Sequence, residues 1–175
     1  TGGMHLDGFA DTLDGLFCFG DREKKLEVMK DSRIGAYGVI GLVSVILLKY
    51  LFISSLSETY LIPALIGFPV ISRWMMTFAI VFYPYIRERG LGKAFAGQKL
   101  TSFLIAGIST VLINFLIAKT EGLIVVLGVF IAGFLFNHYL FRQLGGMTGD
   151  TYGALNEFCE IMVLLIYSIL SFRIG

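Results

Sequence analysis

Long apolar stretches separated by short polar segments dominate this chain. A helix that spans a bilayer needs about 20 mostly apolar residues. Four stretches meet that requirement, and a fifth is apolar only after Glu157 and Glu160. Because backbone groups in hydrocarbon must be hydrogen-bonded within their own segment, these stretches are predicted to be helices rather than strands. The five predicted spans are residues 36–56, 60–83, 100–118, 122–141 and 154–172.

Two further helices are predicted before the first span. Residues 21–33 are charged and amphipathic, with Leu26 and Met29 three positions apart, which indicates a surface helix capped by Asp21. Residues 5–19 alternate acids with small and apolar residues, and this pattern also indicates a helix. The predicted fold class is therefore all-α. We expect a polytopic transmembrane helix bundle of about five spans, with an N-terminal motif helix and a surface amphipathic helix.

Composition agrees with a membrane domain and excludes other classes. Of the 175 residues, 56% are hydrophobic and only 15% are charged, whereas a soluble domain carries about 25% charged residues. The net charge of +1 gives no basic field for a nucleic acid, and Cys18 and Cys159 indicate neither a metal motif nor a disulfide scaffold. The chain opens at Thr1 inside a polar motif, so we expect its natural N-terminus to be missing. The oligomeric state stays open, with a homo-oligomer among the options.

Lysine and arginine residues are concentrated on one side of the predicted bundle. Of the fourteen, ten fall on one side, two on the other and two inside spans. By the positive-inside rule, the richer side is cytoplasmic. The polar segments 5–33, 84–99 and 142–153 fall on that face, so we expect a multi-pass cell-membrane protein with a shared site facing the cytoplasm. The ten residues are Arg22, Lys24, Lys25, Lys30, Arg33, Arg87, Arg89, Lys93, Lys99 and Arg142, against Lys119 and Arg173 opposite.

The segment HLDGFADTLDG carries three acids on one helix face. Asp7, Asp11 and Asp14 are spaced i, i+4 and i+7, which places them within an arc of roughly 60° on a helix. Like charges at this spacing repel one another, so the face favours a cation. Magnesium takes oxygen ligands and bridges carboxylates to substrate phosphates, and we predict a magnesium site here. The alternative interpretation is a set of caps on a solvated face.

The segment GGMTGDTYGALNE, residues 145–157, leads into the fifth span. Its glycines free the backbone, and Asp150 or Thr151 is a candidate cap for the helix. A helix N-terminus attracts phosphate through its free N–H groups, whereas Asp150 is alternatively a metal ligand opposite the acidic stripe. A capped helix entry with polar packing explains the segment equally well. Its candidate substrate-binding residues are Gly146, Thr148, Asn156 and Glu157.

Cations flank a glycine turn in the segment RERGLGKAF. Arg87, Arg89 and Lys93 suit the oxygens of a pyrophosphate, although the positive-inside rule alone also explains each of them. Arg73 lies inside the second span, where an arginine needs a carboxylate or a phosphate as partner. Lys49 lies inside the first span and is expected to snorkel or to pair with an acid.

The two histidines are weaker candidates. His5 is two residues from Asp7, so on a regular helix it points away from the acidic stripe. At the start of the helix it is still able to reach a shared site. His138 lies near the cytoplasmic end of the fourth span, where an interhelical hydrogen bond is a more common role than catalysis.

Five motifs follow one another in the order HLDGFADTLDG, MKDSRIGAYG, Arg73-Trp74, RERGLGKAF and GGMTGDTYGALNE. In that order they resemble the cobalamin synthase family, also called adenosylcobinamide-GDP ribazoletransferase. The resemblance runs from the first residue to about Glu160 and implies one integral-membrane catalytic domain, residues 1–175. Relative to that family, the chain is expected to lack an N-terminal portion with at least one membrane segment.

The resemblance implies the last assembly step of the vitamin B12 coenzyme. The expected substrates are adenosylcobinamide-GDP and α-ribazole or its 5′-phosphate. The ribose 3′-hydroxyl of the ribazole would attack the phosphorus on the corrinoid side of the pyrophosphate. GMP would leave, and adenosylcobalamin or its 5′-phosphate would form.

The candidate residues fit this chemistry, because attack on a pyrophosphate requires charge to be neutralised on the bridging and leaving oxygens. The hydroxyl proton would pass to a carboxylate that is not occupied by metal or to His5. We expect one or two magnesium ions held by Asp7, Asp11, Asp14 and Asp150. The expected diphosphate clamp is drawn from Arg33, Arg87, Arg89 and Lys93, with Arg73 as a further substrate-binding candidate.

Two other classes stay open. A CDP-alcohol phosphotransferase also uses an aspartate- and glycine-rich helix stripe, but its usual pattern has alanine-arginine after the second aspartate-glycine. This chain has Ala10-Asp11 nearby instead, and the segment GGMTGDTYGALNE favours cobalamin synthase. An ion-coupled transporter would carry acids near the middle of the membrane along its pathway, whereas these acids cluster at one face.

Overall fold

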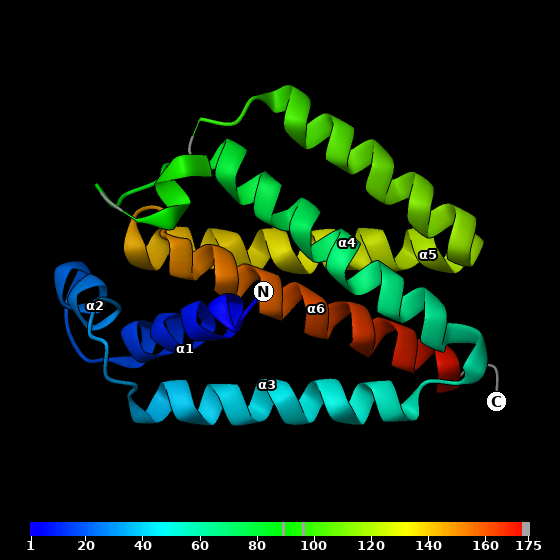
Figure 1. Ribbon diagram of the computed structural model, residues 1–175, viewed down its shortest axis with the longest axis horizontal. Coiled ribbons are helices and arrows are strands. Elements are labelled where there is room, and N and C mark those ends of the chain that lie inside the picture. Colours follow the sequence, from blue (N-terminus) through cyan, green and yellow to red (C-terminus); the bar gives the residue numbers. More distant parts are fainter. Residues whose placement is uncertain (89, 96, 173–175) are drawn as a thin grey trace.

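The computed structural model describes residues 1–88, 90–95 and 97–172 and is built from helices (Figure 1). The predicted all-α membrane bundle is confirmed, with both helices before the first span present. The elements are α1 (Met4–Phe17), α2 (Arg22–Val28), α3 (Ala36–Ser55), α4 (Glu58–Phe82), the short 3-10 helix η1 (Leu91–Phe95), α5 (Leu100–Leu144) and α6 (Gly149–Phe172).

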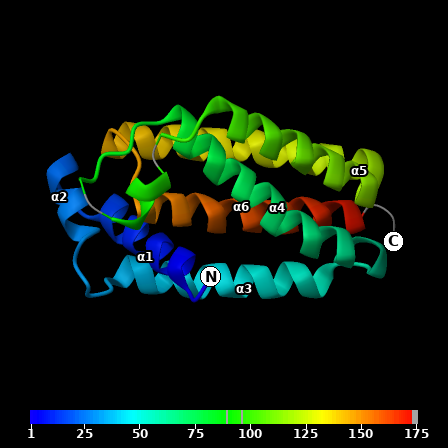
Figure 2. The same ribbon diagram turned by 45° about the horizontal axis from the view of Figure 1, so that its top comes forward.

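Four of these helices, α3 to α6, are long and apolar enough to cross a membrane. At 45 residues α5 is too long for one crossing, and its backbone leaves helical geometry at Ala118 and Lys119, where Lys119 has φ 46°. The backbone of Gly122 there lies directly against the carbonyl of Asn114, so α5 doubles back. Figures 1 and 2 show its two arms leaving one bend, and in Figure 1 they spread apart away from it. The two arms correspond to the predicted spans 100–118 and 122–141, so each of the five predicted spans falls on a helical segment.

The polar segments gather at one end of the bundle, as predicted. Figure 1 shows α2, the loop with η1 and the junction between α5 and α6 at the same end, and the α3–α4 turn and the bend of α5 at the other. Two backbone hydrogen bonds join the loops. The amide of Ile86 donates to the Met147 carbonyl at 3.0 Å, and the Met147 amide donates to the Pro84 carbonyl at 2.8 Å.

Small residues bring α1 against both α3 and α6. A Cβ on Gly8 would lie 2.8 Å from the Cα of Asp150, and one on Gly153 would lie 3.0 Å from the His5 carbonyl oxygen. On the other side, Gly41 of α3 receives the side chain of Leu13. Close backbone approach through glycine is a common way for membrane helices to pack. It places the acidic motif of α1 beside the start of α6.

The surface helix is shorter than predicted. Asp21 caps α2 as expected, because its Oδ1 accepts the Lys24 amide at 2.9 Å. The helix ends at Val28 instead of continuing to Arg33. Asp31 accepts the amide of Arg33 at 3.0 Å in a local turn, and such a side-chain bond to the backbone competes with helix continuation.

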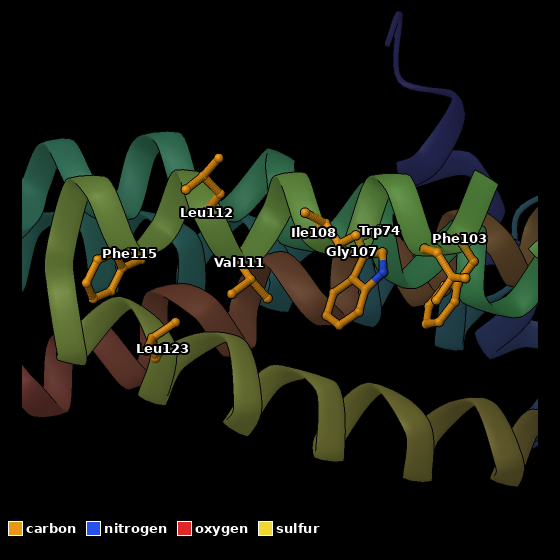
Figure 3. Close-up of a pocket in the computed structure, with 9 residues that line it drawn as sticks. Trp74, Phe103, Gly107, Ile108, Val111, Leu112, Phe115 and Leu123 are labelled. Atoms are coloured by element: carbon orange, nitrogen blue, oxygen red, sulfur yellow. The ribbon is translucent and has the colours of Figure 1, made fainter. Parts of the chain in front are cut away.

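An apolar hollow of about 570 Å³ lies between α4 and the two arms of α5 (Figure 3). Trp74 stacks on Phe103 and Phe130, with ring centroids 5.6 and 5.3 Å apart. Acyl chains are as apolar as such a surface, so a lipid-facing position suits it. The hollow shares none of its lining residues with the polar cavity described below.

Candidate active site

A polar cavity of about 430 Å³ opens where α1, α4, the loop after α4 and the start of α6 meet. Titratable groups of both signs line it together with aromatic and aliphatic walls, so it combines charged contacts with apolar area. Its charged and imidazole side chains are His5, Asp7, Arg73, Arg87 and Asp150. The cavity therefore brings together residues from four of the five sequence motifs.

Asp11 lies beside this cavity in an electrostatically strained position. Burial, followed by the negative charges of Asp150 and Asp7, raises the pKa of Asp11 to about 6. The positive charge of Arg87 opposes this shift but does not cancel it. Near neutral pH the Asp11 carboxylate is therefore ionised in surroundings that disfavour its charge. A bound cation would relieve that cost.

Arg87 is held at the cavity by an acid and by a backbone carbonyl. Its Nη2 lies 2.6 Å from Oδ2 of Asp150, and both side chains are only 19% exposed. The same nitrogen donates to the Met29 carbonyl at 3.1 Å. These contacts join the loop after α4 to α6 and to the end of α2, so the guanidinium keeps one position at the cavity wall.

His5 begins the buried wall of the cavity and is 8% exposed. Burial, and then the positive charge of Arg73, lowers the pKa of the His5 imidazole below its ordinary value. The ring is thus neutral at pH 7, and its buried Nδ1 has no hydrogen-bond partner within the described chain. A neutral imidazole at a cavity is able to accept a proton.

The start of α6 is capped by a pair of threonines. Thr148 Oγ1 accepts the Thr151 amide at 3.2 Å, and Thr151 Oγ1 accepts the Thr148 amide at 2.8 Å. This reciprocal arrangement is a capping box. Of the two predicted caps, Thr151 takes part and Asp150 does not, because its carboxylate is paired with Arg87. Gly146 is buried against Pro84 and Ile86, and neither Gly146 nor Thr148 lines the cavity.

Asp14 differs from the other two acids of the stripe. Its Oδ2 accepts the Gly35 amide at 2.7 Å, and its Oδ1 accepts the Gly38 amide at 2.8 Å. These N–H groups belong to the start of α3, which lacks a cap from its own N-cap residue Gly35. Asp14 as a metal ligand stays a prediction, and in the structure each of its oxygens accepts a backbone amide.

Two of the predicted clamp residues lie away from the cavity. Arg33 is paired with Asp31 at 2.7 Å, and its side chain is 86% exposed. Lys93 is exposed and donates to the Glu88 carbonyl at 2.6 Å. Neither lines the cavity. Arg89 lies outside the described residues.

Arg73 has the buried partner that its position inside a span requires. Its Nη1 lies 3.1 Å from Oε1 of Glu160 and also donates to Asn156. Lys49 pairs with acids as well, lying 2.6 Å from Glu157 and 2.5 Å from Glu160. Both predictions of a partner for an intramembrane cation are confirmed. Asn156 and Glu157, predicted to bind substrate, belong to this network rather than to the cavity lining.

Sequence reasoning missed several residues. Glu160 is the acid shared by Arg73 and Lys49, and its spacing of three and four residues from Glu157 and Asn156 was an available signal for one helix face. Tyr85 and Tyr152 form an aromatic wall of the cavity, with ring centroids 6.0 Å apart. No local pattern marks Tyr85, because its neighbour comes from a segment far along the chain.

The carboxylates near the cavity fit a magnesium ion by chemistry and by charge. Asp7, Asp11 and Asp150 are hard oxygen donors, and burial together with the negative charges of Asp150 and Asp7 raises the Asp11 pKa. Across the residues that the structure describes, no group of three or more His, Cys, Asp or Glu side chains is arranged to hold a metal ion. Side-chain rotation would be needed to bring these oxygens to a common ion.

The fold and the site together define a multi-pass helical membrane protein with a cavity of carboxylates, guanidinium groups and an imidazole at one end of its bundle. The chain belongs to the cobalamin-5-phosphate synthase family, whose sequence profile matches residues 1–168.

Two similar proteins carry the same name. The chain is 39% identical over 165 residues to an adenosylcobinamide-GDP ribazoletransferase of Roseiflexus sp. (strain RS-1), covering 94% of this chain and 61% of that relative. It is 41% identical over 174 residues to the protein of that name from Caldanaerobacter subterraneus subsp. tengcongensis, covering 97% of this chain and 70% of the relative. The chain thus spans only part of the length of these relatives. No solved structure matches it.

Proposed function

We propose that this protein is a magnesium-dependent transferase that moves the cobinamide-phosphate moiety of adenosylcobinamide-GDP to the ribose hydroxyl of α-ribazole or α-ribazole 5′-phosphate. The products would be GMP and adenosylcobalamin or its 5′-phosphate. Family membership supports this reaction, and the relatives are named for it. The observation that carries the proposal is the cavity where Asp7 and Asp150 lie with Arg73 and Arg87, because carboxylates and guanidiniums together suit a metal-bound diphosphate.

Arg73 and Arg87 bind the diphosphate in this proposal. A guanidinium offers several N–H donors in a plane and matches phosphate oxygens. Arg87 is fixed by Asp150 and the Met29 carbonyl, and Arg73 by Glu160 and Asn156. Two anchored cations on one cavity hold both phosphates in this proposal.

The proton of the attacking hydroxyl goes to His5 in this proposal. The ribazole 3′-oxygen forms a bond to the phosphorus on the corrinoid side, and the bond from that phosphorus to the oxygen bridging to GMP breaks. The His5 imidazole is the acceptor, since the ring is neutral at pH 7 and the residue lines the cavity. The leaving GMP takes the bridging oxygen and its electron pair.

Asp7, Asp11 and Asp150 are the proposed magnesium ligands. A magnesium ion bound there would neutralise charge on the diphosphate oxygens as the leaving group departs. Asp14 is not included, because its oxygens accept the Gly35 and Gly38 amides. We further propose that the cavity end of the bundle faces the cytoplasm, on the strength of its excess of lysine and arginine.

The test is GMP release by the purified full-length protein in detergent or nanodiscs, with and without magnesium. Adenosylcobinamide-GDP with α-ribazole should give magnesium-dependent GMP, and a CDP-alcohol donor with the same acceptor should give no product. Sealed vesicles containing the protein should show no ion flux driven by either substrate. Turnover of the CDP-alcohol donor would support the phosphotransferase alternative, and coupled flux without GMP release would support a transporter.

A further inference from the structure

An ionic network lies between α3, α4 and α6, next to the polar cavity but behind its wall. Lys49 Nζ of α3 bonds Oε2 of Glu157 at 2.6 Å and Oε2 of Glu160 at 2.5 Å. Arg73 Nη1 of α4 lies 3.1 Å from the other oxygen of Glu160. Asn156 completes the network by donating from Nδ2 to the same Glu160 oxygen at 2.9 Å.

Within this network only Arg73 reaches the cavity. Its side chain is 41% exposed, whereas those of Glu157 and Glu160 are 6% and 7% exposed. Within the described chain, Arg73 donates side-chain hydrogen bonds from Nη1 alone. The guanidinium is thus anchored at one corner, and its remaining donors are available on the cavity side.

The charges of the network balance. Two cations, Lys49 and Arg73, face two carboxylates, Glu157 and Glu160, so the sum is zero. Without Lys49 the same acids would outnumber Arg73, and the cluster behind the cavity would carry a charge of −1. Charges act over a long range in a medium of low dielectric constant. Such a surplus would oppose the binding of an anion to Arg73.

We propose that Lys49 is a positioning residue that keeps Arg73 able to bind an anionic ligand. It neutralises Glu157 and shares Glu160, so that Arg73 is oriented by Glu160 without losing its positive field at the cavity. The inference rests on the proposed function in so far as the anion is a diphosphate. It extends that function to a residue on α3 that does not line the cavity.

A purely structural role for the network makes a different prediction. If these bonds only tie three helices together, removing either charge leaves a buried unpaired partner and damages the protein in the same direction. If the net charge behind the cavity matters, removing Lys49 and removing Glu157 change anion affinity in opposite directions. The sign of the effect therefore separates the two roles.

The experiment compares four full-length variants: Lys49→Met, Glu157→Gln, the double variant and Lys49→Arg. The affinity for inorganic pyrophosphate is measured by calorimetry, the KM for adenosylcobinamide-GDP by GMP release, and the melting temperature as a check of folding. Lys49→Met should weaken pyrophosphate binding by at least about fivefold, and Glu157→Gln should strengthen it by at least about fivefold, because each variant removes one unit charge close to the bound anion. The double variant and Lys49→Arg should lie within about twofold of the wild type.

Weaker pyrophosphate binding in both single variants, or no recovery in the double variant, would overturn the proposal. If Lys49→Met does not fold, the decision falls to Glu157→Gln, which must bind pyrophosphate more tightly than the wild type. The pyrophosphate measurement does not depend on turnover. A wild-type protein that binds pyrophosphate with these reciprocal shifts but releases no GMP would refute the proposed reaction and leave the role of Lys49 standing.

Discussion

The two ends of the acidic stripe on α1 have opposite surroundings. At the C-terminal end, Asp14 is buried and each of its oxygens accepts a backbone amide from the start of α3. Towards the N-terminal end, Asp7 and Asp11 lie near Asp150, and the Asp11 carboxylate has its pKa raised to about 6 by burial and by like charge. The Asp14 carboxylate has hydrogen-bond donors on both oxygens, whereas the Asp7 and Asp11 carboxylates add negative charge beside Asp150.

The difference shows that residue type and helical spacing do not assign a role by themselves. An acid that is fully bonded to N–H donors stabilises a helix start, whereas acids that repel one another at a cavity form a place for a cation. Substitutions at the two ends of the stripe should therefore have different effects, on stability at Asp14 and on metal-dependent activity at Asp11.

Asp11→Ala should lower magnesium-dependent GMP release by at least about a hundredfold, the loss typical when a main source of electrostatic stabilisation is removed. The melting temperature of the metal-free protein should not fall, because the Asp11 charge is disfavoured in the folded state. Activity and thermal unfolding are measured on the same full-length preparation. Near-normal turnover in this variant would remove Asp11 from the metal site.

Asp14→Ala should act mainly on stability. It leaves the buried amides of Gly35 and Gly38 without their acceptor, at an expected cost of about 2–4 kcal/mol in the free energy of unfolding. Thermal or denaturant unfolding in detergent measures the loss. Residual folded protein should keep the magnesium dependence of the wild type. A variant that stays fully stable but no longer responds to magnesium would show that Asp14 is a ligand after all.

Gly8→Ala tests the contact that brings the acids of α1 to Asp150. The added Cβ would lie 2.8 Å from the Cα and 2.9 Å from the carbonyl oxygen of Asp150, so the helices must separate, at a cost of about 1–3 kcal/mol. GMP release should fall about tenfold as that spacing changes.

Gly128→Ala is the matched control for this substitution. Its Cβ would meet only the terminal Cδ1 of Ile166, at 2.8 Å, and that methyl group is able to rotate away. Activity should stay near that of the wild type. Equal losses in Gly128→Ala and Gly8→Ala would mean that any tightening of the bundle is harmful, and that the approach of α1 to Asp150 has no special importance.

The smallest effect expected is on metal-free stability. Since the folded-state pKa of Asp11 lies above its ordinary value, ionisation costs stability as pH rises from about 4 towards about 6, and the cost is complete above that range. Asp11→Asn removes it and should stabilise the protein in EDTA at pH 7.5 by about 1 kcal/mol, after allowance for solvent screening. At pH 4 the two proteins should melt together. A lower melting temperature for Asp11→Asn at pH 7.5 would contradict the assigned strain.

The spans were predictable because a bilayer imposes length and hydropathy on every helix that crosses it. The two arms of α5 were predicted as separate spans, and in the structure they form one helix with a break at Ala118 and Lys119. The grouping of three polar motifs at one end followed from counting passes. The predicted end of α2 was wrong by several residues. A side-chain hydrogen bond of Asp31 forms a local turn there, and a hydropathy pattern does not reveal such a bond.

The sequence predicted which segments meet at the site but not which side chains of those segments contact one another. Placing Asp7 and Asp11 near Asp150 required only that their segments share one face of the membrane. The partner of Asp14 depends on how α1 packs against α3, which no local spacing reveals. Arg33 carried the right charge in the right segment but is exposed beside Asp31. Long-range packing therefore decides which charged residues reach the cavity.

The most direct test of the central claim is to locate a bound divalent cation. Manganese replaces magnesium at oxygen sites and is visible by anomalous scattering in crystals of the full-length protein. We predict one or two anomalous peaks within bonding distance of the Asp7, Asp11 and Asp150 carboxylates, and their loss in Asp11→Asn. A peak at Asp14 instead, or none near α1 under conditions that support GMP release, would contradict the account.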